Sequence, residues 1–200
     1  MKTIHGTLAA ALFALGLASC NSSTDSVKEA QKTNEAKIDS TKGTTARADS
    51  VKDAKKDDSE FLTKAASGDM LEVQMGKEVA KRATTAGARQ AAEKMVSDHT
   101  KAGAELKALA AKKNITLPPV LGDDQQKIYN DVLAKKGADL DKEYVKQMVK
   151  DHKDDIKEYT DALTGGTDPE VKAFAKKTVP VLQMHLSMFE KLQASMDAKK

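Results

Sequence analysis

The amino-acid sequence predicts an all-α protein whose main domain is a bundle of four long helices. Two observations support this prediction. Apolar residues recur at helical spacing from Ser59 onward, and no segment alternates apolar and polar residues as a β-strand does. Glycine, asparagine and proline interrupt the pattern at the points where helices are expected to end.

Residues 1–19 predict a signal peptide, because a short basic start is followed by apolar or small residues from position 8 onward. The run ends in Leu-Ala-Ser-Cys at positions 17–20, which is similar to a lipobox. We therefore expect Cys20, the only cysteine, to become the acylated first residue of the mature protein and to attach it to a membrane. An ordinary signal peptide with an incidental cysteine is the alternative.

The expected location is the bacterial cell envelope. Residue 21 is Asn21 and not the aspartate associated with retention in the inner membrane, so the outer membrane, facing the periplasm, is favoured. A single cysteine forms no internal disulfide even in an oxidising compartment, and helix packing alone must stabilise the fold.

Residues 20–57 predict a flexible polar tether. They contain only three large apolar side chains, too few to repay the entropy of ordering the backbone: Val27, Ile38 and Val51. A short phrase occurs twice, as DSVKEAQK at 25–32 and DSVKDAKK at 49–56, which is typical of linker expansion. A weak transient helix is the alternative.

Residues 58–195 predict one helical domain. Five helices are expected there, over residues 59–83, 86–113, 124–136, 139–164 and 168–195. Asp168 followed by Pro169 is typical of an N-cap and a first helical turn. About 25 residues connect the second and fourth helices, which favours a ferritin-like topology with one long crossover over a simple up-and-down bundle.

The charge pattern argues against nucleic acid as a partner. Lys and Arg total 33, Asp and Glu total 30, and the two signs alternate along the chain without a basic block. The sequence also lacks a glycine-rich phosphate loop and any Ser, His and Asp set in a motif context, so an enzyme is not the favoured interpretation.

Three histidines are expected on the inward faces of three different long helices. His99, His152 and His185 each have apolar residues at the positions three or four residues away. Glu72 occupies the corresponding face of the remaining long helix. The sequence thus places one ionisable side chain from each long helix in the core.

Imidazoles and a carboxylate that converge on a bundle axis are the ligands that iron, zinc, copper or manganese accept. We therefore predict a metal site formed by Glu72, His99, His152 and His185. The alternative is a hydrogen-bonded histidine core without metal, in a structural or stress-related envelope protein. A di-iron site is not supported, because the positions three residues before the histidines are Val96, Val149 and Leu182 instead of glutamate.

A similar five-residue sequence ends at two of the histidines, MVSDH at 95–99 and MVKDH at 148–152. One hypothesis is that Asp98 and Asp151 orient imidazoles on neighbouring helices and that the methionines offer soft sulfur ligands. The simpler interpretation, which the sequence favours, is that the methionines fill the core and the aspartates are solvated.

Four phrases between residues 58 and 194 resemble the exported bacterial proteins of domain-of-unknown-function family 4142: FLTKAASGDMLEVQMGKEVA, MVSDHTKAGAELKALAAKKNITLP, YVKQMVKDHKDDIKEY and DPEVKAFAKKTVPVLQMHL. The resemblance implies a ferritin-like four-helix bundle in the cell envelope. The family's motif residues fall at Glu72, His99, His152 and His185. The resemblance implies no particular activity.

Overall fold

The structure is a computed structural model that describes residues 25–41 and 46–198. Over these residues it contains six α-helices and no β-strand, which confirms the all-α prediction. The helices are α1 (Ser26–Asp39), α2 (Ala46–Arg82), α3 (Ala86–Lys112), α4 (Asp123–Leu133), α5 (Gly137–Gly165) and α6 (Pro169–Asp197). Across the described part of the chain, no helix has both the length and the apolarity that a membrane span requires.

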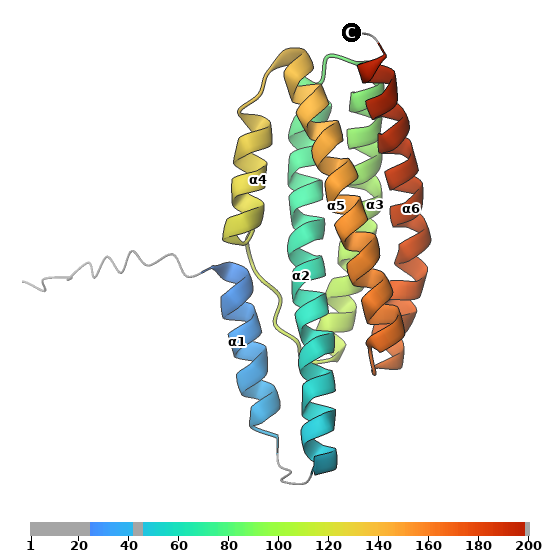
Figure 1. Cartoon of the computed structure of the whole chain (residues 1–200). Coiled ribbons are helices and arrows are strands. Elements are labelled where there is room, and N and C mark those ends of the chain that lie inside the picture. Colours follow the sequence, from blue (N-terminus) through green and yellow to red (C-terminus); the bar gives the residue numbers. More distant parts are fainter. Residues whose placement is uncertain (1–24, 42–45, 199–200) are drawn as a thin grey trace, which may run out of the picture.

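The long helices α2, α3, α5 and α6 lie alongside one another, and α1 and α4 pack against α2 (Figure 1). Residues 83–85 join α2 to α3 and residues 166–168 join α5 to α6, so each pair is antiparallel. Residues 113–136 form the long connection that contains α4. This connection returns along the outside of α2, and α3 and α5 therefore run in the same direction.

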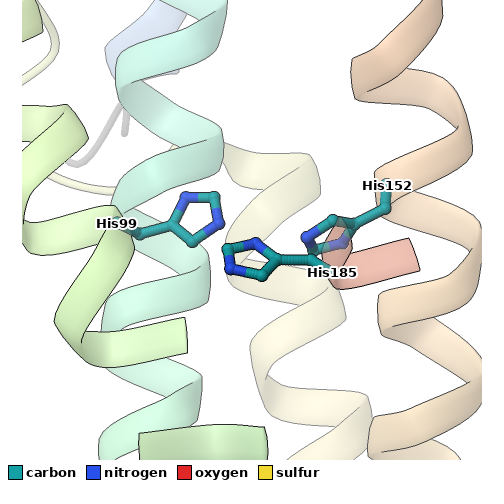
Figure 2. A group of neighbouring side chains, drawn as sticks. All are labelled: His99, His152 and His185. Carbon is teal, nitrogen blue, oxygen red and sulfur yellow. The ribbon is translucent and has the colours of Figure 1, made fainter. Parts of the chain in front are cut away.

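Two clusters of buried apolar side chains form the core. One is built around Met75, Met95, Tyr144 and Phe189, and the other around Leu62, Leu106, Tyr159 and Phe174. Along α3, α5 and α6, the histidines drawn in Figure 2 fall between the residues of one cluster and those of the other. The core thus encloses the histidines from both ends, in surroundings of low dielectric constant.

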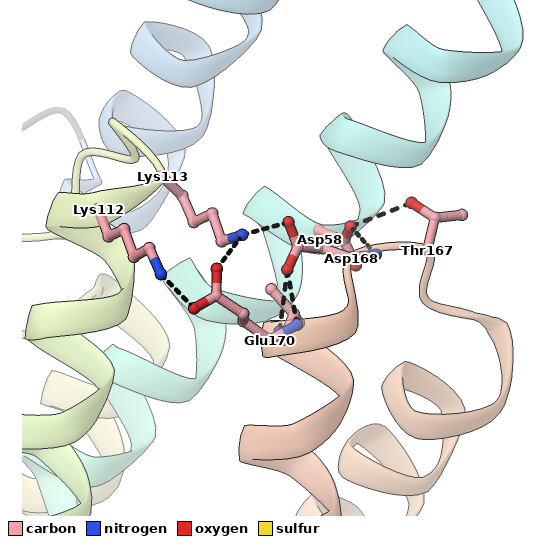
Figure 3. Close-up of polar contacts among 7 residues, drawn as sticks. Asp58, Lys112, Lys113, Thr167, Asp168 and Glu170 are labelled. Carbon is pink, nitrogen blue, oxygen red and sulfur yellow. Dashed lines mark hydrogen bonds and ion pairs between the residues drawn. The ribbon is translucent and has the colours of Figure 1, made fainter.

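Side-chain caps begin the last helix as predicted. Asp168 accepts hydrogen bonds from the backbone N–H groups of Glu170 and Val171 at the start of α6. Asp58 of α2 accepts hydrogen bonds from Oγ1 of Thr167 and from the backbone N–H of Asp168. Lys113 forms ion pairs with Asp168 and Glu170 (Figure 3). This network ties α2, the end of α3 and the start of α6 together.

The flexible tether predicted for residues 20–57 is wrong where the structure describes it. Residues 26–39 form α1, and residues 46–57 begin α2. The buried side chain of Asn34 donates to the carbonyl of Thr116 (2.9 Å) and accepts from its N–H (2.7 Å), and Lys37 donates to Oγ1 of Thr116 (2.7 Å). Polar contacts therefore hold α1 in place, which a count of apolar residues does not detect.

The predicted signal peptide, residues 1–19, and Cys20 lie outside the described residues.

Candidate metal centre

The four predicted ligands come together in the core. Glu72 lies on α2, His99 on α3, His152 on α5 and His185 on α6, and none is more than 4% exposed. The imidazole centroids are 5.3 Å apart for His99 and His185, 5.4 Å for His152 and His185, and 5.9 Å for His99 and His152. Figure 2 shows the three rings gathered at one level of the molecule. Each long helix thus contributes one of these side chains.

Each imidazole is held in place through one of its two nitrogens. Nδ1 of His99 lies 2.7 Å from Oδ1 of Asp69 and 2.8 Å from Oε2 of Glu72. Nδ1 of His152 donates to the backbone carbonyl of Met148 at 2.9 Å, one helical turn earlier. Such a hydrogen bond fixes the orientation of a ring and decides which nitrogen carries the proton.

Nε2 of His185 donates to Oδ2 of Asp98 at 2.9 Å. The sequence left two interpretations of the aspartate in the repeated Met-Val-x-Asp-His sequence, one that orients an imidazole and one that is only solvated. For Asp98 the first is correct, and the second, which the sequence favoured, is wrong. Asp151 contacts no histidine through a hydrogen bond and instead accepts one from the side chain of Gln147 (2.7 Å).

The second nitrogen of each ring is buried and has no hydrogen-bond partner among the described residues. These atoms are Nε2 of His99, Nε2 of His152 and Nδ1 of His185. One ring nitrogen from each histidine lies within 4.8 Å of the others. A buried polar atom without a partner costs about 1–3 kcal/mol, so three in one place need an explanation. Three neighbouring imidazole nitrogens are a donor set that fits zinc, copper or iron.

The carboxylate of Glu72 lies beside two of the rings. Its Oε2 contacts Nδ1 of His99, while its Oε1 is buried, forms no hydrogen bond and lies 3.5 Å from Nδ1 of His152. Glu72 also shares two groups of closely spaced ligand atoms, one with Asp69 and His99 and one with His152 and Asp155. Carboxylate oxygens therefore lie beside two of the three histidines, His99 and His152.

The charges of these groups depend on one another. Burial alone would lower the pKa of His99, but Glu72 and Asp69 raise it well above its ordinary value. Burial would likewise raise the pKa of Glu72, but the histidines, His99 first, lower it. Burial lowers the pKa of His152, and it lowers the pKa of His185 to about 4. His152 and His185 are therefore neutral near pH 7, as metal ligands must be, whereas His99 holds a proton that it would release on binding an ion.

Asp69 was not predicted from the sequence. This residue is 7% exposed and its Oδ1 is the nearest partner of His99, while its Oδ2 is buried without a hydrogen bond. The signal that could have found it is spacing, because Asp69 precedes Glu72 by three residues and so shares its helix face.

Comparisons with known proteins agree with this fold. A fragment of a DUF305 protein from Deinococcus radiodurans, known from its crystal structure, is similar to this chain with a TM-score of 0.62 at 10% sequence identity. The similarity covers 70% of this chain and 96% of the fragment, and at this identity it concerns the fold alone. No curated protein sequence matches the chain. The family model described as "Domain of unknown function (DUF4142)" matches residues 40–192, and the chain therefore belongs to this family, as its sequence motifs indicate.

Proposed function

We propose that this protein is a lipid-anchored envelope protein that binds one transition-metal ion between its four long helices. The observation that carries the proposal is the set of three buried imidazole nitrogens without hydrogen-bond partners, one each from α3, α5 and α6. In a hydrogen-bonded histidine core, these nitrogens would find partners within the protein. An ion would satisfy all three together.

The proposed ligands are those three nitrogens and the carboxylate of Glu72, whose free Oε1 makes a fourth donor. Four ligands of this kind match the coordination number that zinc adopts, and the nitrogen-rich set favours zinc, copper or iron over manganese. Asp69, Asp98 and the carbonyl of Met148 hold the rings from outside. The ion would neutralise the buried charge of Glu72 and link the four long helices.

The helix arrangement supports a ferritin-like four-helix bundle as the scaffold. In that topology two antiparallel helix pairs are joined by one long crossover, as α2 with α3 and α5 with α6 are joined here through residues 113–136. Ligands that project inward from facing helices are typical of metal sites in such bundles.

The test is metal analysis of residues 20–200, which include every described residue, with Cys20→Ser in all samples and no His tag. We expect close to one ion per chain after incubation with zinc, copper or iron and removal of excess. His152→Ala and His185→Ala should lose it. Thr178→Val, a buried polar change on α6, is the matched control and should keep it. A wild-type chain that retains none of these metals contradicts the proposal and favours the structural histidine core.

The anchor is proposed to be an acyl group on Cys20, in the outer membrane and facing the periplasm. Radiolabelled palmitate supplied to cells that make the full-length chain should label the protein, and Cys20→Ser should abolish the label and release the protein from the membrane fraction. Labelling that survives Cys20→Ser contradicts this assignment. This test is independent of the metal analysis.

A further inference from the structure

A cavity of about 430 Å³ lies between α2, α3 and the loop that follows α3. Its wall includes both buried and exposed side chains: Asp69 and His99 are buried, whereas Gln74, Lys77, Thr100 and Lys107 are exposed. The cavity therefore extends from the surface of the molecule to His99, one of the proposed metal ligands.

Asp69 has one free oxygen at the inner end of this cavity. Its Oδ1 is occupied by His99, but its Oδ2 is buried and has no hydrogen-bond partner. Gly103 of α3 also lines the cavity, and a Cβ built on it would lie 3.6 Å from this Oδ2. Gly103 thus places no side chain against the free carboxylate oxygen, and a Cβ there would only touch it.

Asp69 also lies beside the proposed site. Ligand atoms of Asp69, Glu72 and His99 are within 4.8 Å of one another. A cation held by Asp69 would therefore be within one short step of Glu72 and of the imidazole of His99. A bare carboxylate oxygen is a ligand that a hydrated divalent ion accepts readily.

We propose that this cavity is the passage through which the metal ion reaches the core, and that Asp69 is the first ligand it meets there. The inference rests on the proposed metal-binding function and adds to it the route and the residue that receives the ion. Lys77 and Lys107 at the mouth repel cations, so the passage should work faster when salt screens their charges.

The test is the rate of Co²⁺ uptake by residues 20–200, followed by the visible absorption of the bound ion in a stopped-flow instrument. In the variant Gly103→Leu a large side chain is expected to fill the cavity. Gly103→Ala is the matched control, because its Cβ makes only ordinary van der Waals contacts. Both substitutions replace glycine with a better helix former, so they affect helix stability in the same direction. We expect Gly103→Leu to slow uptake at least about tenfold, as binding then requires the helices to part, with the final amount of bound Co²⁺ unchanged. Gly103→Ala should bind as fast as the wild type.

Two further variants test the residues along the passage. Asp69→Asn keeps the size of the side chain but removes its charge, and it should slow uptake several-fold. Replacing both Lys77 and Lys107 with glutamine should speed uptake at low salt and reduce its dependence on salt. If Gly103→Leu binds Co²⁺ as fast as the wild type, the passage is refuted while the metal site stands. If the wild type binds no Co²⁺, zinc, copper or iron, the metal site itself is refuted.

Discussion

Asp98 on α3 accepts a hydrogen bond from Nε2 of His185 on α6, with 2.9 Å between the two atoms. Asp98 also pairs with Lys94 one turn earlier, at 2.9 Å, and its side chain is 20% exposed. The contact therefore reaches from the surface to a buried ring, and it leaves Nδ1 of His185 without a hydrogen-bond partner.

Asp98→Ala should weaken metal binding without abolishing it. The change frees the ring of His185 to rotate, and loss of such an orienting partner typically costs about 10–100-fold in metal affinity. Competition with a coloured chelator measures the effect. Asp154→Ala, which also removes an aspartate paired with a lysine four residues away, is the control and should leave the affinity unchanged. Equal affinities in the two variants would show that Asp98 does not orient a ligand.

In the metal-free protein, His99→Ala should lower stability far more than His185→Ala. His99 is the closest partner of two buried carboxylates, and its removal leaves Asp69 unpaired and Glu72 with only the more distant His152, which typically costs about 3–5 kcal/mol. His185 has a single carboxylate partner, which is partly exposed to water. Urea denaturation in the presence of a chelator measures both values. The pairing of His99 would be refuted if the two variants were equally stable.

Asp151→Asn should stabilise the protein near pH 8 and have a smaller effect near pH 5. Burial, reinforced by Glu72, raises the pKa of Asp151 to about 7. The unfolded carboxyl ionises near the ordinary pKa of 3.8, so stability falls as the pH rises from that value to about 7 and stays low above it. Melting temperatures of the wild type and the variant across this range provide the measurement. Asp154→Asn, at an exposed position on the same helix, is the matched control, and the prediction is wrong if Asp151→Asn has the same effect at both pH values.

Asn34→Ala should destabilise the protein by about 1–3 kcal/mol, because it removes a hydrogen bond to Oγ1 of Thr63 and two to the backbone of Thr116, whose groups are left without partners. Urea denaturation monitored by circular dichroism gives this value. The exposed neighbour changed in Glu35→Ala should have little effect. If Asn34→Ala is as stable as that control, the hydrogen bonds of Asn34 do not stabilise the fold.

The long helices could be predicted because their signals are local. Apolar spacing placed α3, α5 and α6 within a few residues of their observed ends, and Asp168 marked the start of α6 through its own side chain. The burial of His99, His152 and His185 followed from their apolar neighbours on the same helix. Each of these features depends on residues within one or two turns.

The remaining features depend on contacts between distant residues. Thr116 and Asn34 form hydrogen bonds although 82 positions separate them in the sequence, and no local sequence pattern predicts such a pair. The partner of His185 is Asp98, 87 positions away. The repeated sequence that ends at His99 indicated Asp98 as a candidate orienting residue, but not which histidine it contacts. Asp69 was overlooked because an aspartate in a helix is usually solvated, and only the packing of α3 against α2 brings His99 to it.

If Cys20 is acylated as proposed, the ordered α1 limits how far the domain can extend from the lipid surface. The first described residue is Asp25, which caps α1, and five chain steps separate it from Cys20. In any conformation this segment spans at most about 18 Å. With Cys20 acylated as proposed, the metal site stays in the layer of water next to the bilayer. It would then meet its metal donors and partners mainly by diffusion in the plane of the membrane.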